Sequence, residues 1–278
     1  MPEPKYIAGP TMLPTEVTQR THARLKATGP GNTVQRLLTL EKNCPGLNTG
    51  RANFAGQTPL AHQTDTHAGT IRTQLRAQTH NVHEQLHQHS HFVALFNGTI
   101  SPAQYRALIM KFHGFYVPLE RAVDSAMAQS ASTLGGFRYT NRAALLKQDM
   151  ADLGFDASEI ESNPLFPQMA EFITPASLGG VLYVIEGSTL GAAQIDRAAQ
   201  KILPQDTARG SARGRNFWAW SRASNKSCWG AINGYLDHLE RAGHSNTALI
   251  KGAQDTFQAL ASWIAPLDPA AQSQGFAT

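Results

Sequence analysis

Residues Leu182–Ile195 read LYVIEGSTLGAAQI, an apolar helical segment that includes four residues poor at forming helices. These are Gly187, Ser188, Thr189 and Gly191. A glycine inside a helix costs roughly 1 kcal/mol relative to alanine, so two glycines four residues apart need a reason. Two reasons are open. The small residues could pack closely against another helix, or they could present bare backbone to a flat ligand.

The sequence on both sides of this segment is also helical in pattern, which predicts an all-α fold. No segment alternates strictly between apolar and polar residues as a half-buried strand would. Ser101 followed by Pro102 indicates a helix start, Pro118 a possible kink, and Gly154 and Gly243 helix ends. We expect a single bundle of about six to eight helices. The main helices are predicted within residues 70–90, 101–127, 140–154, 174–203, 216–243 and 246–267.

Composition divides the chain into an extension, a domain and a tail. Residues 1–69 are rich in Pro, Gly, Thr, Asn and Gln and lack sustained apolar periodicity, which predicts a largely irregular N-terminal extension, disordered or loosely helical. Residues 70–268 form the predicted helical domain, and residues 269–278 a C-terminal tail. With 278 residues, 41% of them hydrophobic, the chain can bury one good-sized core.

Charge and motifs argue against several classes of function. The net charge of +4 comes from scattered basic residues rather than a basic stripe, so nucleic-acid binding is not expected. No run of eighteen apolar residues and no secretory signal pattern is seen, which predicts no membrane association and a cytoplasmic location. Cys44 and Cys228 form no metal-binding pair. Without a GxGxxG motif after a strand, no bound flavin or nicotinamide is expected.

Five histidines are crowded between residues 80 and 91, and His83 and His87 lie four apart on one helical face. One interpretation is a solvated polar face. A second is a zinc site, which needs three or four ligands and has no cysteine nearby. A third is a single axial imidazole for haem iron beside an apolar cleft. His83 suits the third because it lies beside the predicted face of Leu75, Thr79, Val82 and Leu86.

Two segments resemble the biliverdin-producing heme oxygenases of bacteria. LRAQTHNVHEQL, residues 75–86, is similar to the family's proximal helix, in which a Thr precedes the axial His by four residues. LYVIEGSTLGAAQ, residues 182–194, looks like the distal helix. Further segments resemble the family as well, so the likeness spans residues 71–267 and leaves the N-terminal extension outside.

The resemblance implies roles for the residues of both helices. His83 is implied as the proximal iron ligand, and Gly187 and Gly191 as the distal backbone over the haem. Ser188 stands where mammalian-type members have an aspartate that organises water, and bacterial members commonly have a small polar residue there. Ala192 replaces the second glycine of a Gly-Gly pair, a variation that bacterial members also show.

Three more residues are implied in haem binding. Arg76 stands two turns before His83, where the family has a basic residue that contacts a haem propionate. Tyr183 looks like a tyrosine that bacterial members direct at a propionate. Thr79 belongs to the proximal motif and is expected to be a haem-binding residue as well.

The implied activity is oxidative ring opening of haem to biliverdin, with release of CO and ferrous iron. Haem is then both substrate and cofactor, and O2 and external electrons are consumed. The implied electron donor is a ferredoxin or a flavoprotein reductase, and a bilin-binding photoreceptor is a candidate partner. The alternative is a non-catalytic haem carrier or sensor, because a fold does not fix a function. A helical adaptor without a ligand would leave the glycines as packing residues.

Overall fold

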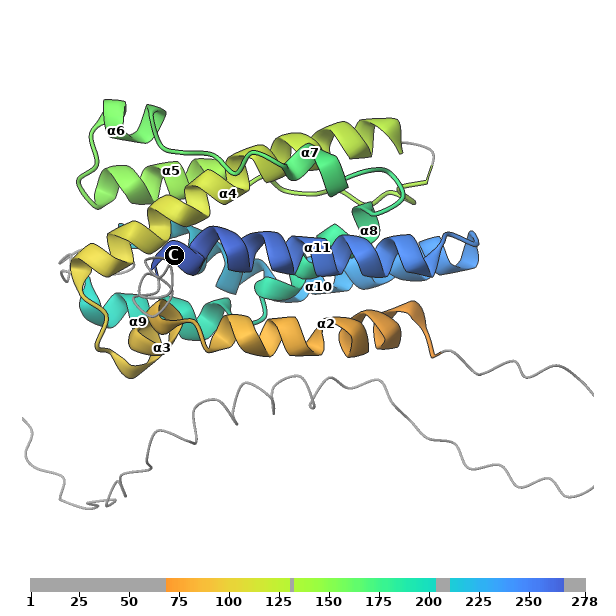
Figure 1. Ribbon diagram of the computed structural model, residues 1–278, viewed down its shortest axis with the longest axis horizontal. Helices are drawn as coiled ribbons and strands as arrows, with labels where there is room; N and C mark the ends of the chain where they lie inside the picture. Colours follow the sequence, from red (N-terminus) through yellow and green to blue (C-terminus); the bar gives the residue numbers. More distant parts are fainter. Residues whose placement is uncertain (1–68, 131–132, 204–210, 268–278) are drawn as a thin grey trace, which may run out of the picture. The chain divides into compact units, whose positions relative to one another are not determined.

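The computed structural model of the protein describes residues 69–130, 133–203 and 211–267. These residues form ten α-helices and one short 3-10 helix and include no strand (Figure 1). The all-α prediction is therefore confirmed. The helices outnumber the predicted six to eight because one predicted helix is broken in two and three short helices were not expected. No helix among the described residues is both long and apolar enough to cross a membrane.

The predicted helix over residues 70–90 is α2 (Ile71–His87), and a further helix that was not predicted, α3 (Ser90–Asn97), follows it. Thr70 caps α2 by accepting a hydrogen bond from the backbone N–H of Thr73. His89 separates the two helices and caps α3, because its ring accepts from the backbone N–H of His91. A histidine is not a usual cap residue, so the local sequence did not signal the start of α3.

Helix α4 (Pro102–Gln129) begins where the Ser101–Pro102 pair predicted. Ser101 and Gln104 form a capping box, in which each side chain accepts from the other residue's backbone N–H. The helix continues past Pro118 to Gln129.

The rest of the described chain adds seven α-helices and a final turn. The predicted helix over 174–203 is broken at residues 189–191 into α8 and α9. The quoted segment, Leu182–Ile195, therefore joins two helices. Two short helices, α6 and α7, connect α5 to α8. The bounds are α5 Ala143–Asp152, α6 Ala157–Glu161, α7 Met169–Phe172, α8 Leu178–Ser188, α9 Ala192–Ile202, α10 Asn216–Arg241, α11 Asn246–Ile264 and η1 Ala265–Leu267.

Helix α11 packs against both α2 and α8, and α10 packs against α8 and α9 (Figure 1). Glycines allow the closest of these approaches. A Cβ at Gly180 would lie 1.7 Å from the carbonyl oxygen of Leu249, and a Cβ at Gly252 would lie 2.5 Å from that of Ser177. The small-residue packing face of α8 is therefore at its start, where it meets α11.

Buried carboxylates connect the helices around the core. Asp149 on α5 accepts from the backbone N–H groups of Asn216 (2.5 Å) and Phe217 (3.0 Å) and so caps α10. Arg142, just before α5, donates through Nη2 to Glu186 Oε1 on α8 at 2.6 Å. These contacts hold the start of α5 against α8 and the rest of α5 against α10.

Candidate functional site

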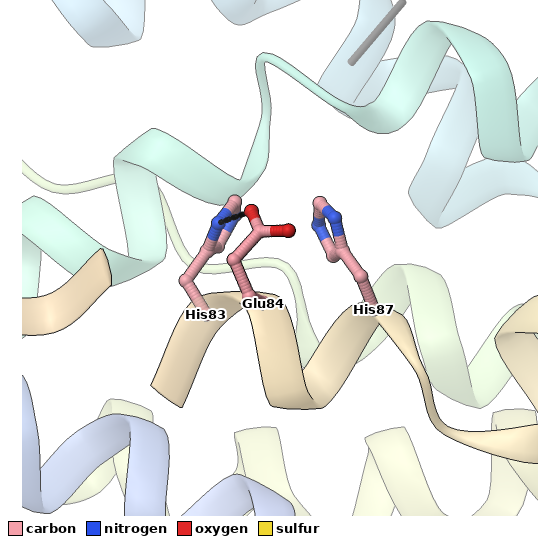
Figure 2. Close-up of side chains that lie close together, drawn as sticks. All are labelled: His83, Glu84 and His87. Carbon is pink, nitrogen blue, oxygen red and sulfur yellow. Dashed lines mark ion pairs between the residues drawn. The ribbon is translucent and has the colours of Figure 1, made fainter. Parts of the chain in front are cut away.

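The C-terminal end of α2 carries three side chains with metal-ligating atoms, those of His83, Glu84 and His87. One ligating atom from each lies within 4.8 Å of the others, and the two imidazole ring centroids are 4.2 Å apart. The Nδ1 atom of His83 is 3.7 Å from Glu84 Oε1. Figure 2 shows all three pointing to the side of α2 on which the ribbon connecting α8 to α9 passes. The site therefore faces the quoted segment.

His83 lies between apolar surroundings and solvent, because its side chain is 32% exposed and its ring meets Phe257 of α11 edge-on at 5.7 Å. Burial, followed by the charge of nearby His83, lowers the pKa of His87 to about 4. His87 is therefore neutral at neutral pH, the state in which an imidazole nitrogen can bind a metal.

The other three histidines of this region differ in environment. His80 is exposed, as the solvated-face interpretation expects. His89 and His91 are buried, and His89 Nε2 lies 3.1 Å from the carbonyl oxygen of Ile264. The solvated-face interpretation is therefore wrong for His89 and His91, which belong to the packing at the start of α3.

Residues 83–87 read His-Glu-Gln-Leu-His, which is the HExxH spacing. In that pattern two histidines one helical turn apart project from the same face and bind one metal ion. The sequence interpretation of the zinc alternative did not take this pattern into account. Figure 2 shows three possible metal ligands close together, which supports a zinc site more strongly than the sequence did.

The quoted segment forms the end of α8 and the start of α9. Ser188 is exposed, while Glu186 and Thr189 are buried. The hydroxyl of Ser188 donates to the carbonyl oxygen of Ile185 at 2.7 Å, and that of Thr189 donates to Glu186 at 2.6 Å. Hydroxyls that bond back to the preceding turn loosen a helix, which accounts for the break here.

Gly187 and Gly191 are not held by packing against the described residues. A Cβ at Gly187 would have Trp229 Cζ3 as its nearest described neighbour, at an ordinary 3.5 Å. A Cβ at Gly191 would have the carbonyl oxygen of Ser188, at 3.8 Å. By contrast, Gly180 near the start of α8 has no room for a methyl group. Of the two reasons for these glycines, the structure favours space left for a ligand over close helix packing.

The heme oxygenase family model matches residues 70–265 of the chain. The chain belongs to the heme oxygenase family. Among solved structures it is similar to heme oxygenase-1 from the cyanobacterium Synechocystis, determined in complex with heme. The TM-score is 0.57 at 16% identity, with 74% of this chain and 96% of the other covered, so this likeness concerns the fold. No curated protein matches this chain.

The remaining sequence-predicted residues of this heme oxygenase family member lie on α2 and α8. Arg76 is exposed two turns before His83. Tyr183 is half-buried, and its ring centroid is 5.7 Å from that of Trp229 on α10. Thr79 is buried, and its hydroxyl donates to the carbonyl oxygen of Leu75 at 2.7 Å. Their roles toward haem stay predictions.

Two features near the distal segment of this heme oxygenase family member were missed by sequence reasoning. Burial raises the pKa of the Tyr116 phenol on α4, and this outweighs the effect of the Ser188 hydroxyl, which lies near enough to lower that pKa. The buried Arg142–Glu186 ion pair lies next to Gly187 in the chain. Neither had a sequence signal, because each contact joins residues far apart in the chain and no local pattern specifies the pairing.

Proposed function

We propose that this protein opens the haem ring oxidatively, forming biliverdin, CO and ferrous iron from haem, O2 and external electrons. Membership of the heme oxygenase family supports an enzyme of this type and haem as its ligand. The observation that carries the proposal is the pairing of His83 with glycines 187 and 191. The histidine projects toward the α8–α9 connection, and both glycines have room that the described packing does not fill.

His83 is the proposed ligand of the haem iron. A neutral imidazole supports oxygen binding to ferrous haem, whereas a thiolate ligand favours cleavage of the O–O bond. Bound haem supplies both the redox-active iron and the porphyrin carbon that is oxidised. The contact of the His83 ring with Phe257 of α11 limits the orientations that this ring can take.

The α8–α9 connection is the proposed distal wall. Backbone at Gly187 and Gly191 allows a flat porphyrin to approach closely, which a larger side chain would prevent. The Ser188 hydroxyl donates to Ile185, so its remaining lone pairs can accept from water. Residues 187–191 include no titratable side chain. With haem bound, such a wall would leave only backbone, small hydroxyls and water beside the ring and would offer no side-chain acid from residues 187–191.

Arg76 and Tyr183 are proposed to contact the haem propionates, with Thr79 in the same binding region. The carboxylates would pair with the Arg76 guanidinium in a charge-assisted contact and accept from the Tyr183 hydroxyl. A ferredoxin or flavoprotein reductase is the proposed electron donor, and the net charge of +4 favours an acidic partner. A bilin-binding photoreceptor as recipient of the product is part of the same proposal.

The test is an anaerobic haem titration of the purified protein, followed by air and reductant. We expect a Soret band that saturates at one haem per chain and then decays as a bilin absorption grows. The extracted pigment identifies the carbon attacked. Stable haem without bilin would contradict ring opening and support a carrier or sensor. No haem binding would reject the assigned site altogether.

A further inference from the structure

The side chains around His83 offer more ligands than haem iron uses. One imidazole suffices as the axial ligand of haem in the proposed site. Glu84 and His87 nevertheless project to the same side of α2, with the Glu84 carboxylate drawn between the two rings in Figure 2. Together with His83 they present two nitrogens and one oxygen within 4.8 Å of one another.

This spacing fits a single small ion. Zinc binds imidazole nitrogen and carboxylate oxygen at about 2.0–2.2 Å, so its ligand atoms lie up to about 4 Å apart. Small side-chain rotations would therefore bring the three atoms onto one ion. The His83 and His87 rings are already adjacent, and Glu84 Oε1 is 3.7 Å from His83 Nδ1.

The donor types define the class of ion. Imidazole nitrogen suits zinc, copper and nickel, whereas magnesium and calcium prefer sites made of oxygen alone. No further His, Cys, Asp or Glu joins this group within the part of the chain that the structure describes. Three protein ligands and a water molecule would complete a tetrahedral zinc site.

We propose that the haem-free protein binds a divalent transition-metal ion such as Zn²⁺ through His83, Glu84 and His87, and that this ion competes with haem. The competition rests on the proposed role of His83 as haem ligand. A neutral imidazole has one nitrogen with a free lone pair, so His83 cannot bind both metals at once. A metal-loaded chain is then unable to take up haem until the ion leaves.

The first experiment measures Zn²⁺ binding to the full-length, haem-free chain by calorimetry in a buffer that does not bind metals. His87→Ala removes one ligand, and His80→Ala is the matched control because His80 is exposed on the same helix. We expect wild type and His80→Ala to bind one Zn²⁺ with equal affinity. His87→Ala should bind it at least about tenfold more weakly. Equal affinities for all three chains would overturn the proposal.

The second experiment repeats the haem titration with and without saturating Zn²⁺. At a concentration that saturates wild type but not His87→Ala, we expect Zn²⁺ to weaken haem binding to wild type and His80→Ala by at least about tenfold and to have a smaller effect on His87→Ala. Zinc bound without any effect on haem would overturn the competition. If His83→Ala kept the histidine-ligated haem spectrum, the proposed haem ligand would be wrong. The Zn²⁺ affinities of the first experiment would still decide the metal site separately.

Discussion

His83 and His80 are separated by less than one turn of α2, yet their surroundings differ. His80 is exposed, whereas the His83 ring contacts Phe257 and His87. An axial ligand needs a fixed orientation, which these neighbours give to His83 and which an exposed side chain lacks. The chemistry proposed here therefore depends on one imidazole among several.

Replacing this imidazole gives the first prediction. His83→Ala should lose the histidine-ligated haem spectrum and bilin formation, because the substitution removes the proposed axial imidazole. Imidazole added to the solution should restore the spectrum in part by occupying the space left. Absorption spectra of haem-loaded wild type, His83→Ala and His80→Ala test this, with His80→Ala expected to match wild type. An unchanged spectrum in His83→Ala would contradict the assignment.

Two kinds of glycine occur in the α8–α9 segment, and they differ in what surrounds them. Gly179 and Gly180 meet side chains and backbone of α10 and α11 at distances too short for a methyl group. A Cβ added at Gly187 or Gly191 would lie 3.5 Å or more from its nearest described neighbour. The first pair serves helix packing, and the second pair is the proposed wall of the haem site.

Alanine substitutions should separate these two roles. Gly180→Ala should lower the free energy of unfolding by about 1–3 kcal/mol or more, because its methyl group would collide with the backbone at Leu249. Gly191→Ala should change stability by less than about 1 kcal/mol, since Ser188 is the nearest group at 3.8 Å. Denaturant unfolding of both variants measures the difference. Equal losses would mean that Gly191 is also a packing residue.

Asp149 connects α5 to the start of α10 and predicts a pH dependence of stability. Burial raises the pKa of the Asp149 carboxyl from 3.8 to about 6. It outweighs the hydrogen bonds from Phe217 and Asn216, which lower this pKa. The folded chain therefore holds this proton more tightly than the unfolded chain. The contribution of Asp149 to stability is then greatest below pH 4 and falls as the pH rises through 6, by about 3 kcal/mol.

Asp149→Asn removes this titration while it keeps an oxygen that can accept from the N–H groups of α10. The free energy of unfolding of wild type minus that of Asp149→Asn should therefore decrease between pH 4 and pH 6. Urea unfolding of both chains at several pH values in this range gives the difference directly. A difference that stays constant with pH would contradict the raised pKa.

At the scale of the whole molecule, we propose that residues 70–268 are the functional domain, with residues 1–69 as an extension and 269–278 as a tail. The buried hydrophobic cluster extends from Ile71 to Ile264, and the family match covers residues 70–265. The helices that carry His83, Gly187 and Gly191 all lie within these limits. Where the expected extension and tail fall outside the described residues, their organisation stays a prediction.

Deletion of residues 1–68 should leave the domain folded, because the family match begins at residue 70 and the described hydrophobic cluster at Ile71. We expect the thermal midpoint to change by less than about 4 °C and haem to bind with unchanged affinity. Circular dichroism melting and haem titration of the shortened chain, beside the full chain, test this. A large fall in the thermal midpoint would show that the extension contributes to the stability of the domain. A large fall in haem affinity would show that it contributes to the site.

The sequence by itself determined the helical class, most long helices and the two segments that carry the family resemblance. These features follow from local spacing, from caps such as Ser101 and from motifs within a few turns. Only the tertiary structure decided that α8 ends at Ser188, that His89 is buried and that Arg142 pairs with Glu186. It also distinguished Gly180 from Gly191. The physical reason is that burial and close packing depend on partners distant in the chain, whereas helical periodicity depends on near neighbours.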